Sequence, residues 1–212
     1  MSAPLSAAAE SRLKLAMDLG ERAFSLLMFS YLVVNFLPVL TVTPTYGLLL
    51  FSEGLVTAFM VFRRVTLQVS TRPLDWLFAL AGTAAPLFVR PAPGVHPLAP
   101  LNVIIFLFLF GNAVAIWGKL TLRRSFGLAA ANRGVVEGGP YRFVRHPIYA
   151  GYIFFWAANL LNIPTLFNAS LYAFTLTLVV IRVLAEERIL KLDPVYTAFM
   201  DRVRFRLAPG LF

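Results

Sequence analysis

The chain has 212 residues, of which 59% are hydrophobic and only 14% are charged. Soluble domains carry roughly 25% charged residues, so this composition excludes an ordinary soluble fold and indicates a lipid bilayer as the solvent. A membrane protein of this length has room for about five or six spans of roughly 20 residues each, and we expect one structural domain. The formal net charge of +9 requires a separate explanation.

The sequence contains no cysteine, which excludes disulfide bonds, a thiolate metal site and a catalytic thiol. The polar N-terminal segment precedes a long apolar run without a convincing cleavage site, so a retained first span is expected rather than a signal peptide. His96 has no second histidine or acid beside it in the sequence and is assigned no role. No metal site is predicted.

Apolar runs separated by proline-containing turns predict an all-α membrane protein with about six transmembrane helices. The predicted spans are residues 23–42, 46–62, 74–89, 98–118, 148–161 and 164–184. The last two spans are joined by a short turn and should form a helical hairpin. Within the single domain we expect a four-span scaffold at residues 1–118 and a cofactor-binding catalytic region at residues 119–212.

Basic residues alternate from one predicted connection to the next. They precede span one, lie between spans two and three, and lie between spans four and five, whereas Arg90 is the one arginine in a connection of the opposite parity. The positive-inside rule therefore predicts an integral membrane protein with both termini in the cytoplasm. The basic residues concerned are Arg12, Lys14, Arg22, Arg63, Arg64, Arg72 and the group from Lys119 to Arg145. This topology accounts for the net charge, so no nucleic-acid partner is expected, although the arginines can also attract anionic lipids.

The densest group of functional side chains lies at the start of span five, in the sequence GGPYRFVRHPIYAGY at residues 138–152. Tyrosine and arginine commonly anchor a helix at the lipid headgroups, so an interfacial belt is one interpretation of this segment. The order and spacing of the residues favour a second interpretation, a binding site.

The string GPYRFVRHPIYAG resembles the cofactor-binding signature of the isoprenylcysteine carboxyl methyltransferase and phospholipid methyltransferase families of membrane enzymes. The resemblance includes RGVVEGGPYR before the hairpin, EERIL after it, and Tyr196 followed by RVRFRLAPGLF. It covers roughly residues 133–212. The first three spans show no motif and are expected to be hydrophobic scaffold.

This resemblance implies that S-adenosylmethionine binds between the segment before the hairpin and the helix after it. Main-chain groups of Val135 and Val136 would meet the adenine base, and Glu186 would reach the amino group. Carried over by position, the implied cofactor-binding residues are Arg133, Gly134, Val135, Val136, Tyr141, His146, Pro147, Ile148, Tyr149 and Glu186. The cofactor's cationic groups favour carboxylates and aromatic faces, and its carboxylate favours an arginine or a histidine N–H.

Arg182 and Glu186 are four residues apart on the last span and project from one helical face, whereas Glu187 is turned about 100° away. An ordinary ion pair in water is one interpretation of the first two. By resemblance, Arg182 is the catalytic residue that binds the substrate carboxylate, and Glu187 is a further candidate for substrate binding. Glu53 lies inside span two, where an ionisable group is costly; a functional role and a pairing across helices both remain open.

These observations predict a methyltransferase whose lipophilic or amphiphilic acceptor enters from the bilayer, most like isoprenylcysteine carboxyl O-methylation. Phospholipid amines, lipid phenols or quinones, and thiols remain alternative acceptors. A membrane sterol-type reductase with bound NADPH is a further alternative, in which Arg142 and Arg145 would meet the phosphates. A non-enzymatic adaptor would leave the clustered His, Tyr and Glu side chains without a role.

Overall fold

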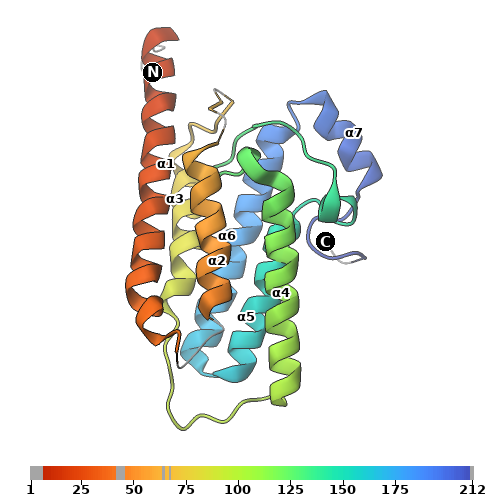
Figure 1. Cartoon of the computed structure of the whole chain (residues 1–212). Coiled ribbons are helices and arrows are strands. Elements are labelled where there is room, and N and C mark those ends of the chain that lie inside the picture. The colour runs from red at the N-terminus through yellow and green to blue at the C-terminus, as the bar shows by residue number, and fades with distance from the viewer. Residues whose placement is uncertain (1–6, 42–45, 64, 67, 211–212) are drawn as a thin grey trace.

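The computed structural model describes residues 7–41, 46–63, 65–66 and 68–210, and it is all-helical apart from loops and an isolated β-bridge between Val69 and Ala131. Figure 1 shows long helices packed side by side, with a short helix beyond them at one end of the bundle. The α-helices are α1 (Ala7–Phe36), α2 (Tyr46–Val61), α3 (Pro73–Ala84), α4 (Leu101–Leu122), α5 (Pro147–Asn162), α6 (Leu166–Leu190) and α7 (Pro194–Arg202). Short 3-10 turns are η1 (Leu37–Val39), η2 (Ala85–Phe88), η3 (Arg123–Ser125) and η4 (Gly139–Arg142). The predicted all-α class is confirmed.

Each predicted span overlaps a helix of the described chain, but the ends differ. α1 begins at Ala7, well before the predicted start at residue 23, and α6 continues to Leu190 instead of ending at residue 184. The first part of α1 is polar, so hydropathy does not reveal it. α7 was not predicted; Asp193 caps it by accepting the Val195 N–H, and proline at its first position favours the start of a helix.

Two helical segments in the described part of the chain are long and apolar enough to cross a membrane, residues 101–125 and Leu166–Leu190. The segments Tyr46–Val61 and 73–88 are apolar but shorter. Large hydrophobic side chains lie exposed along the bundle: the exposed fraction is 72% for Val34, 63% for Phe106 and 85% for Leu166. An aqueous solvent would penalise such a surface, whereas lipid would not.

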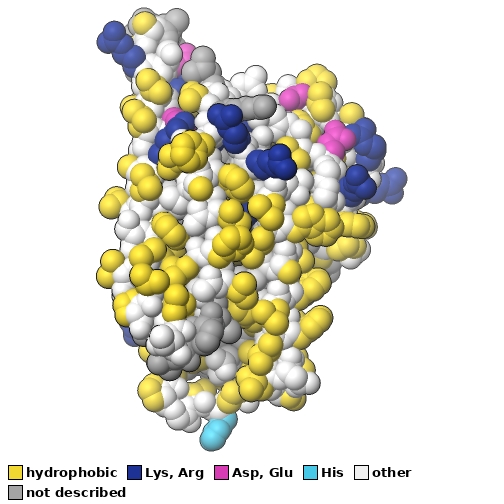
Figure 2. Space-filling view, viewed as in Figure 1, with side chains coloured by type: hydrophobic (Ala, Val, Ile, Leu, Met, Phe, Trp, Pro, Cys, Tyr) yellow, Lys and Arg dark blue, Asp and Glu magenta, His cyan; other side chains and the backbone are white. Residues whose placement is uncertain are grey.

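The basic connections share one end of the bundle. α1 begins at this end, and the α2–α3 connection, the α4–α5 connection and α7 lie there too (Figure 1). Lysine and arginine side chains gather at the same end in the space-filling view, while hydrophobic side chains cover most of the remaining face (Figure 2). Arg64, which contributes to the predicted charge alternation, lies outside the described residues. That this end faces the cytoplasm remains a prediction.

α4 and α5 pack closely because small residues line their contact. A Cβ atom on Gly111 would lie 2.6 Å from the Gly151 carbonyl oxygen, and one on Gly151 would lie 2.6 Å from the Gly111 oxygen. Ala115, one turn after Gly111, also meets Gly151. Small residues one turn apart let two helix backbones approach within a bilayer, so this contact fixes the start of α5 against α4.

Candidate active site

A cavity of about 240 Å³ lies inside the bundle, toward the end that carries the basic connections. Its polar part is formed by the loop before η4, the start of α5, the end of α6 and α7. Its apolar arm lies between α1, α2 and α3 and is lined by side chains including Phe24, Met28, Leu32, Leu49, Val56 and Leu87. The first three helices therefore contribute directly to the cavity. The sequence predicted only a hydrophobic scaffold for them.

Most of the predicted cofactor-binding residues line this one cavity. Pro147 does not line it, because it is the first residue of α5 and its ring is packed within the protein. Those that line the cavity are Arg133, Gly134, Val135, Val136, Tyr141, His146, Ile148, Tyr149 and Glu186. Arg182 lines it as well. The fold thus brings together residues from the loop, α5 and α6 that are more than 50 positions apart in sequence.

The loop that precedes η4 is held by Glu21, which is 1% exposed in the polar part of α1. Its carboxylate accepts hydrogen bonds from the backbone N–H groups of Leu128 and Ala129. The Arg63 guanidinium lies 2.8 Å from the same carboxylate, and Arg133 Nη2 lies 3.5 Å from it. Glu21 thereby fixes the loop and orients Arg133 from outside the segment that resembles methyltransferases.

Burial has opposite consequences for Glu21 and Arg133. Burial alone would raise the pKa of Glu21, but the hydrogen bond from Arg63 and the charges of Arg133 and Arg63 outweigh it, so this pKa lies below its ordinary value. Burial lowers the pKa of Arg133 to about 10; the Arg63 charge acts in the same direction, and Glu21 opposes both. Arg133 still carries its charge at neutral pH.

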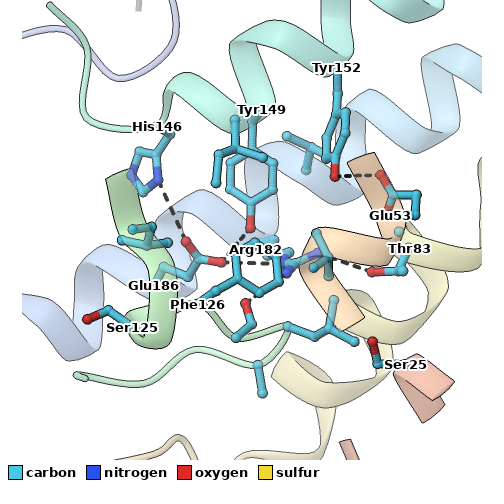
Figure 3. A pocket seen from close by; sticks show the side chains of 18 of the residues that line it. Ser25, Glu53, Thr83, Ser125, Phe126, His146, Tyr149, Tyr152, Arg182 and Glu186 are labelled. Atoms are coloured by element: carbon cyan, nitrogen blue, oxygen red, sulfur yellow. Dashed lines mark hydrogen bonds and ion pairs between the residues drawn. The ribbon is translucent and has the colours of Figure 1, made fainter. Parts of the chain in front are cut away.

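Glu186 is the acidic centre of the polar part (Figure 3). Its Oε1 accepts a hydrogen bond from the Tyr149 hydroxyl and lies 3.3 Å from Arg182 Nε. Its Oε2 lies 3.6 Å from His146 Nδ1. His146 immediately precedes α5, and Glu186 lies one turn before the end of α6, so the hairpin brings the two together.

Arg182 lies one turn before Glu186 and connects the polar part to the apolar arm. Besides Glu186, its guanidinium donates hydrogen bonds to the Thr83 hydroxyl of α3 at 3.2 Å and to the Gly127 carbonyl at 3.4 Å. Its Cζ lies 5.2 Å from the centre of the Tyr149 ring. The side chain is therefore fixed between α3, α5 and the loop, at the point where both parts of the cavity meet.

Glu187 occupies a different environment from Glu186. Its Oε1 accepts a hydrogen bond from Arg145 at 2.8 Å, and its Oε2 accepts one from Arg206 at 3.0 Å. Arg145 also donates to the carbonyl groups of Val203 and Arg204, so this cluster fixes the C-terminal segment against the start of α5. Glu187 does not line the cavity, and a substrate-binding role for it does not fit this geometry.

Three buried polar atoms around the cavity have no hydrogen-bond partner among the described residues: Arg133 Nε, His146 Nε2 and the Tyr196 hydroxyl. His146 Nε2 does lie 3.4 Å from Glu187, without making a hydrogen bond. Buried polar groups are normally satisfied, so these atoms, Arg133 Nε above all, are suited to contacts with a polar ligand in the cavity. Burial raises the pKa values of Tyr141 and Tyr196, which keeps both phenols neutral.

These residues fit S-adenosylmethionine. Glu186 suits a cationic group, and the rings of Tyr141, Tyr149 and Tyr196 provide faces that attract a sulfonium. The free N–H of Arg133 suits a carboxylate or a heteroaromatic nitrogen. Gly134, with φ +99°, has a backbone conformation that favours glycine and leaves its surroundings open.

Residues 103–193 match the family model of the isoprenylcysteine carboxyl methyltransferase (ICMT) family. The match covers the part of the chain from α4 to the start of α7. No curated protein matches the chain. The ICMT match agrees with the family indicated by the motif at the start of α5, and it supports a membrane methyltransferase.

The ICMT match begins in α4 and ends at Asp193, the cap of α7. It includes all the predicted cofactor-binding residues and Arg182. Outside the matched segment, Thr83 in α3 and Tyr196 in α7 are among the residues that line the cavity, and Glu21 in α1 holds the loop that forms one of its walls. Of these three residues, the sequence singled out only Tyr196. The roles of Glu21 and Thr83 depend on contacts with residues far away in the sequence, which no local pattern reveals.

Proposed function

We propose that the protein transfers a methyl group from S-adenosylmethionine to a carboxylate on a lipophilic acceptor, as in isoprenylcysteine carboxyl O-methylation. The observation that carries this proposal is the position of Arg182, where the polar part of the cavity meets its apolar arm. A guanidinium at that point can bind a carboxylate whose hydrocarbon tail extends between α1, α2 and α3.

The cofactor supplies a methyl group on a sulfonium, which is already activated for displacement. A carboxylate oxygen attacks that carbon in line, the carbon–sulfur bond breaks, and the electron pair returns to sulfur; a methyl ester and S-adenosylhomocysteine result. The protein's task is to position the reacting groups and to exclude water. Arg182 orients the acceptor, and Glu186, Tyr149 and His146 hold the donor. An ionised carboxylate needs no general base.

The acceptor is expected to enter sideways from the bilayer through the apolar arm, while the cofactor enters from the cytoplasm. The arm supports this route because its walls are hydrophobic side chains of helices whose outer faces are also hydrophobic. Membrane lipids are the expected surroundings, and no nucleic-acid partner is proposed.

The reductase alternative requires Arg142 and Arg145 to bind the phosphates of NADPH, and the structure does not favour this role for either arginine. Arg145 would bind an NADPH phosphate, but its guanidinium already contacts Glu187 and the carbonyl groups of Val203 and Arg204. Arg142 is exposed. The acid that faces the cavity, Glu186, suits a cationic donor better than a phosphate.

Calorimetric titration of the detergent-solubilised protein with S-adenosylhomocysteine, and separately with NADPH, tests the proposal. We expect S-adenosylhomocysteine to bind and NADPH not to bind. NADPH binding without S-adenosylhomocysteine binding would favour the reductase, and absence of S-adenosylhomocysteine binding would overturn the proposed function.

A further inference from the structure

Two Arg-Phe pairs that are far apart in the sequence both expose their side chains. They are Arg142-Phe143 at the end of η4 and Arg204-Phe205 after α7. The exposed fraction is 63% for Phe143 and 36% for Phe205. Among the described residues, neither guanidinium has a hydrogen-bond or ion-pair partner. These four side chains, here named the Arg-Phe surface, suit a ligand that has an anionic part and an apolar part.

Backbone hydrogen bonds hold the two Arg-Phe pairs on adjacent segments. The Arg145 N–H donates to the Phe205 carbonyl at 2.9 Å, and the His146 N–H donates to the Arg206 carbonyl at 2.8 Å. The Arg145 side chain adds a hydrogen bond to the Arg204 carbonyl at 2.7 Å. The C-terminal segment is therefore paired with the residues that follow Arg142 and Phe143.

The Arg-Phe surface lies level with the last turns of α4. A Cβ atom on Gly139, at the start of η4, would lie 2.6 Å from Thr121 Oγ1 and 3.1 Å from Trp117 Nε1. The apolar segment that ends here, residues 101–125, is about 37 Å long, which exceeds the roughly 30 Å of a hydrocarbon core. Its last turns therefore reach the headgroup layer, where a half-exposed tryptophan such as Trp117 is typical.

The unpaired arginines suit the headgroup of an anionic phospholipid. A guanidinium donates paired hydrogen bonds to phosphate oxygens. Of the acids nearest in sequence, Glu137 is already paired with Arg202, and Asp201 directly precedes that arginine. Figure 2 shows basic side chains directly above hydrophobic ones, the order in which headgroups and acyl chains follow each other. Phosphatidylcholine carries a compensating ammonium and phosphatidylglycerol does not, so the anionic lipid should be preferred.

We propose that the Arg-Phe surface binds the phosphate group of an anionic phospholipid, and that the bound lipid holds the C-terminal segment against the start of α5. The same two segments also support the active site: His146 lines the cavity, and Glu187 joins Arg145 to Arg206. This lipid is a structural ligand on the outer surface, whereas the methyl acceptor occupies the apolar arm. The inference goes beyond the proposed function and does not depend on the identity of the acceptor.

Native mass spectrometry of the detergent-solubilised protein, titrated with phosphatidylglycerol or phosphatidylcholine, tests the binding. The wild type should bind phosphatidylglycerol about tenfold more tightly, because each of two arginines contributes several-fold to the attraction of an anionic lipid. The double variant with Arg142→Gln and Arg204→Gln should reduce this preference to within about threefold. Arg142→Lys with Arg204→Lys keeps both charges and should keep most of the preference.

A second double variant with the same change of charge serves as the matched control. Arg12→Gln and Arg72→Gln alter two exposed arginines on α1 and just before α3, whereas the Arg-Phe surface lies beside α7 (Figure 1). The control should keep the full preference. The proposal is overturned if the wild type shows no preference, if the Arg142 and Arg204 glutamine variant keeps it in full, or if the control loses as much.

Amide hydrogen exchange in nanodiscs tests the stabilising role. The amides of Arg145 and His146 report it, because both donate to the C-terminal segment. Their exchange should be about threefold slower, or more, in an equimolar mixture of phosphatidylglycerol and phosphatidylcholine than in phosphatidylcholine alone. The Arg142 and Arg204 glutamine variant should exchange equally in both. Equal exchange of the wild type in both lipids would overturn the stabilising role. Neither measurement uses the cofactor, so absent S-adenosylhomocysteine binding would reject the proposed function alone.

Discussion

Arg182 and Glu186 lie one turn apart on α6, yet their contacts extend toward different parts of the same cavity. Arg182 contacts Thr83 of α3, next to the apolar arm, whereas Glu186 contacts Tyr149 and His146 in the polar part. The 3.3 Å contact between Arg182 Nε and Glu186 Oε1 joins the two parts. One helical turn can therefore position a methyl acceptor and a methyl donor against each other.

Replacing Glu186 should weaken cofactor binding, whereas replacing Arg182 should abolish methyl transfer. Glu186→Ala and His146→Ala should weaken S-adenosylhomocysteine binding by about tenfold or more, because each removes a polar contact to the donor. Arg182→Ala should preserve that binding and abolish methyl transfer, because it removes the anchor of the acceptor. Calorimetry and a turnover assay on the same samples check this division.

Arg188→Ala is a suitable control for these variants. Arg188 lies on the same helix, its side chain is 40% exposed, and it pairs with Asp75 outside the cavity. Its loss should leave both binding and turnover near the wild-type values. An equal loss of S-adenosylhomocysteine binding in the Glu186, His146 and Arg182 variants would refute separate roles.

Glu187 should contribute to stability rather than to substrate binding. Glu187→Gln weakens the contacts with Arg145 and Arg206, so the C-terminal segment should detach more readily and thermal stability should fall. Limited proteolysis should then cut the tail faster, while the KM for the methyl acceptor stays within about twofold. A large rise in this KM without a loss of stability would instead support a substrate-binding role for Glu187.

Glu21 should stabilise the protein in a pH-dependent manner. Removing one partner of a buried ion pair costs about 3–5 kcal/mol, so Glu21→Gln should lower Tm markedly at pH 7, whereas Glu10→Gln on the surface should not. The folded-state pKa of Glu21 lies below its ordinary value of 4.5, so its contribution is fully present above that value and is lost as the pH falls through the folded-state pKa.

The Tm difference between the wild type and Glu21→Gln measures this contribution directly. It should be constant from pH 7 down to about pH 5 and should shrink at pH values below the ordinary pKa of Glu21, as the native carboxylate becomes protonated. A difference that grows on acidification would contradict the ion-pair network around Arg63 and Arg133.

The close contact between α4 and α5 predicts that a larger side chain at Gly151 lowers thermal stability. Gly151→Ala places a Cβ atom 2.6 Å from the Gly111 oxygen, so the helices must separate, at a cost of about 1–3 kcal/mol. Gly20→Ala is the matched control, because a Cβ there meets no atom within 4 Å and favours the helix. Thermal unfolding should show a lower Tm for the first variant and an equal or higher Tm for the second.

The sequence was sufficient for the features that depend on local patterns. Hydropathy located the long helices, and charge alternation grouped the connections that lie at one end of the bundle. The string at the start of α5 and the four-residue spacing of Arg182 and Glu186 identified the polar part of the cavity. The 100° turn between adjacent helical residues also separated Glu187 from Glu186, although it did not reveal the partners of Glu187.

Other features depend on contacts between distant segments and could not be predicted. The polar start of α1 is stabilised by Glu21, whose partners lie on the loop near residue 128 and at Arg63. Thr83 reaches Arg182 only because α3 packs against α6. For Glu53 the sequence left a functional role and a pairing across helices open; the structure shows the pairing, with Lys119, and places Glu53 among the residues that line the cavity.

The central claim is most directly tested by methyl transfer to a carboxylate. The purified protein is incubated with N-acetyl-S-farnesyl-L-cysteine and S-adenosylmethionine labelled on its methyl group, and the lipid product is then treated with mild alkali. The account predicts a labelled product that releases volatile methanol, as a methyl ester does, and no such product from Arg182→Ala. An alkali-stable labelled product, or no transfer by the wild type, would contradict carboxyl O-methylation.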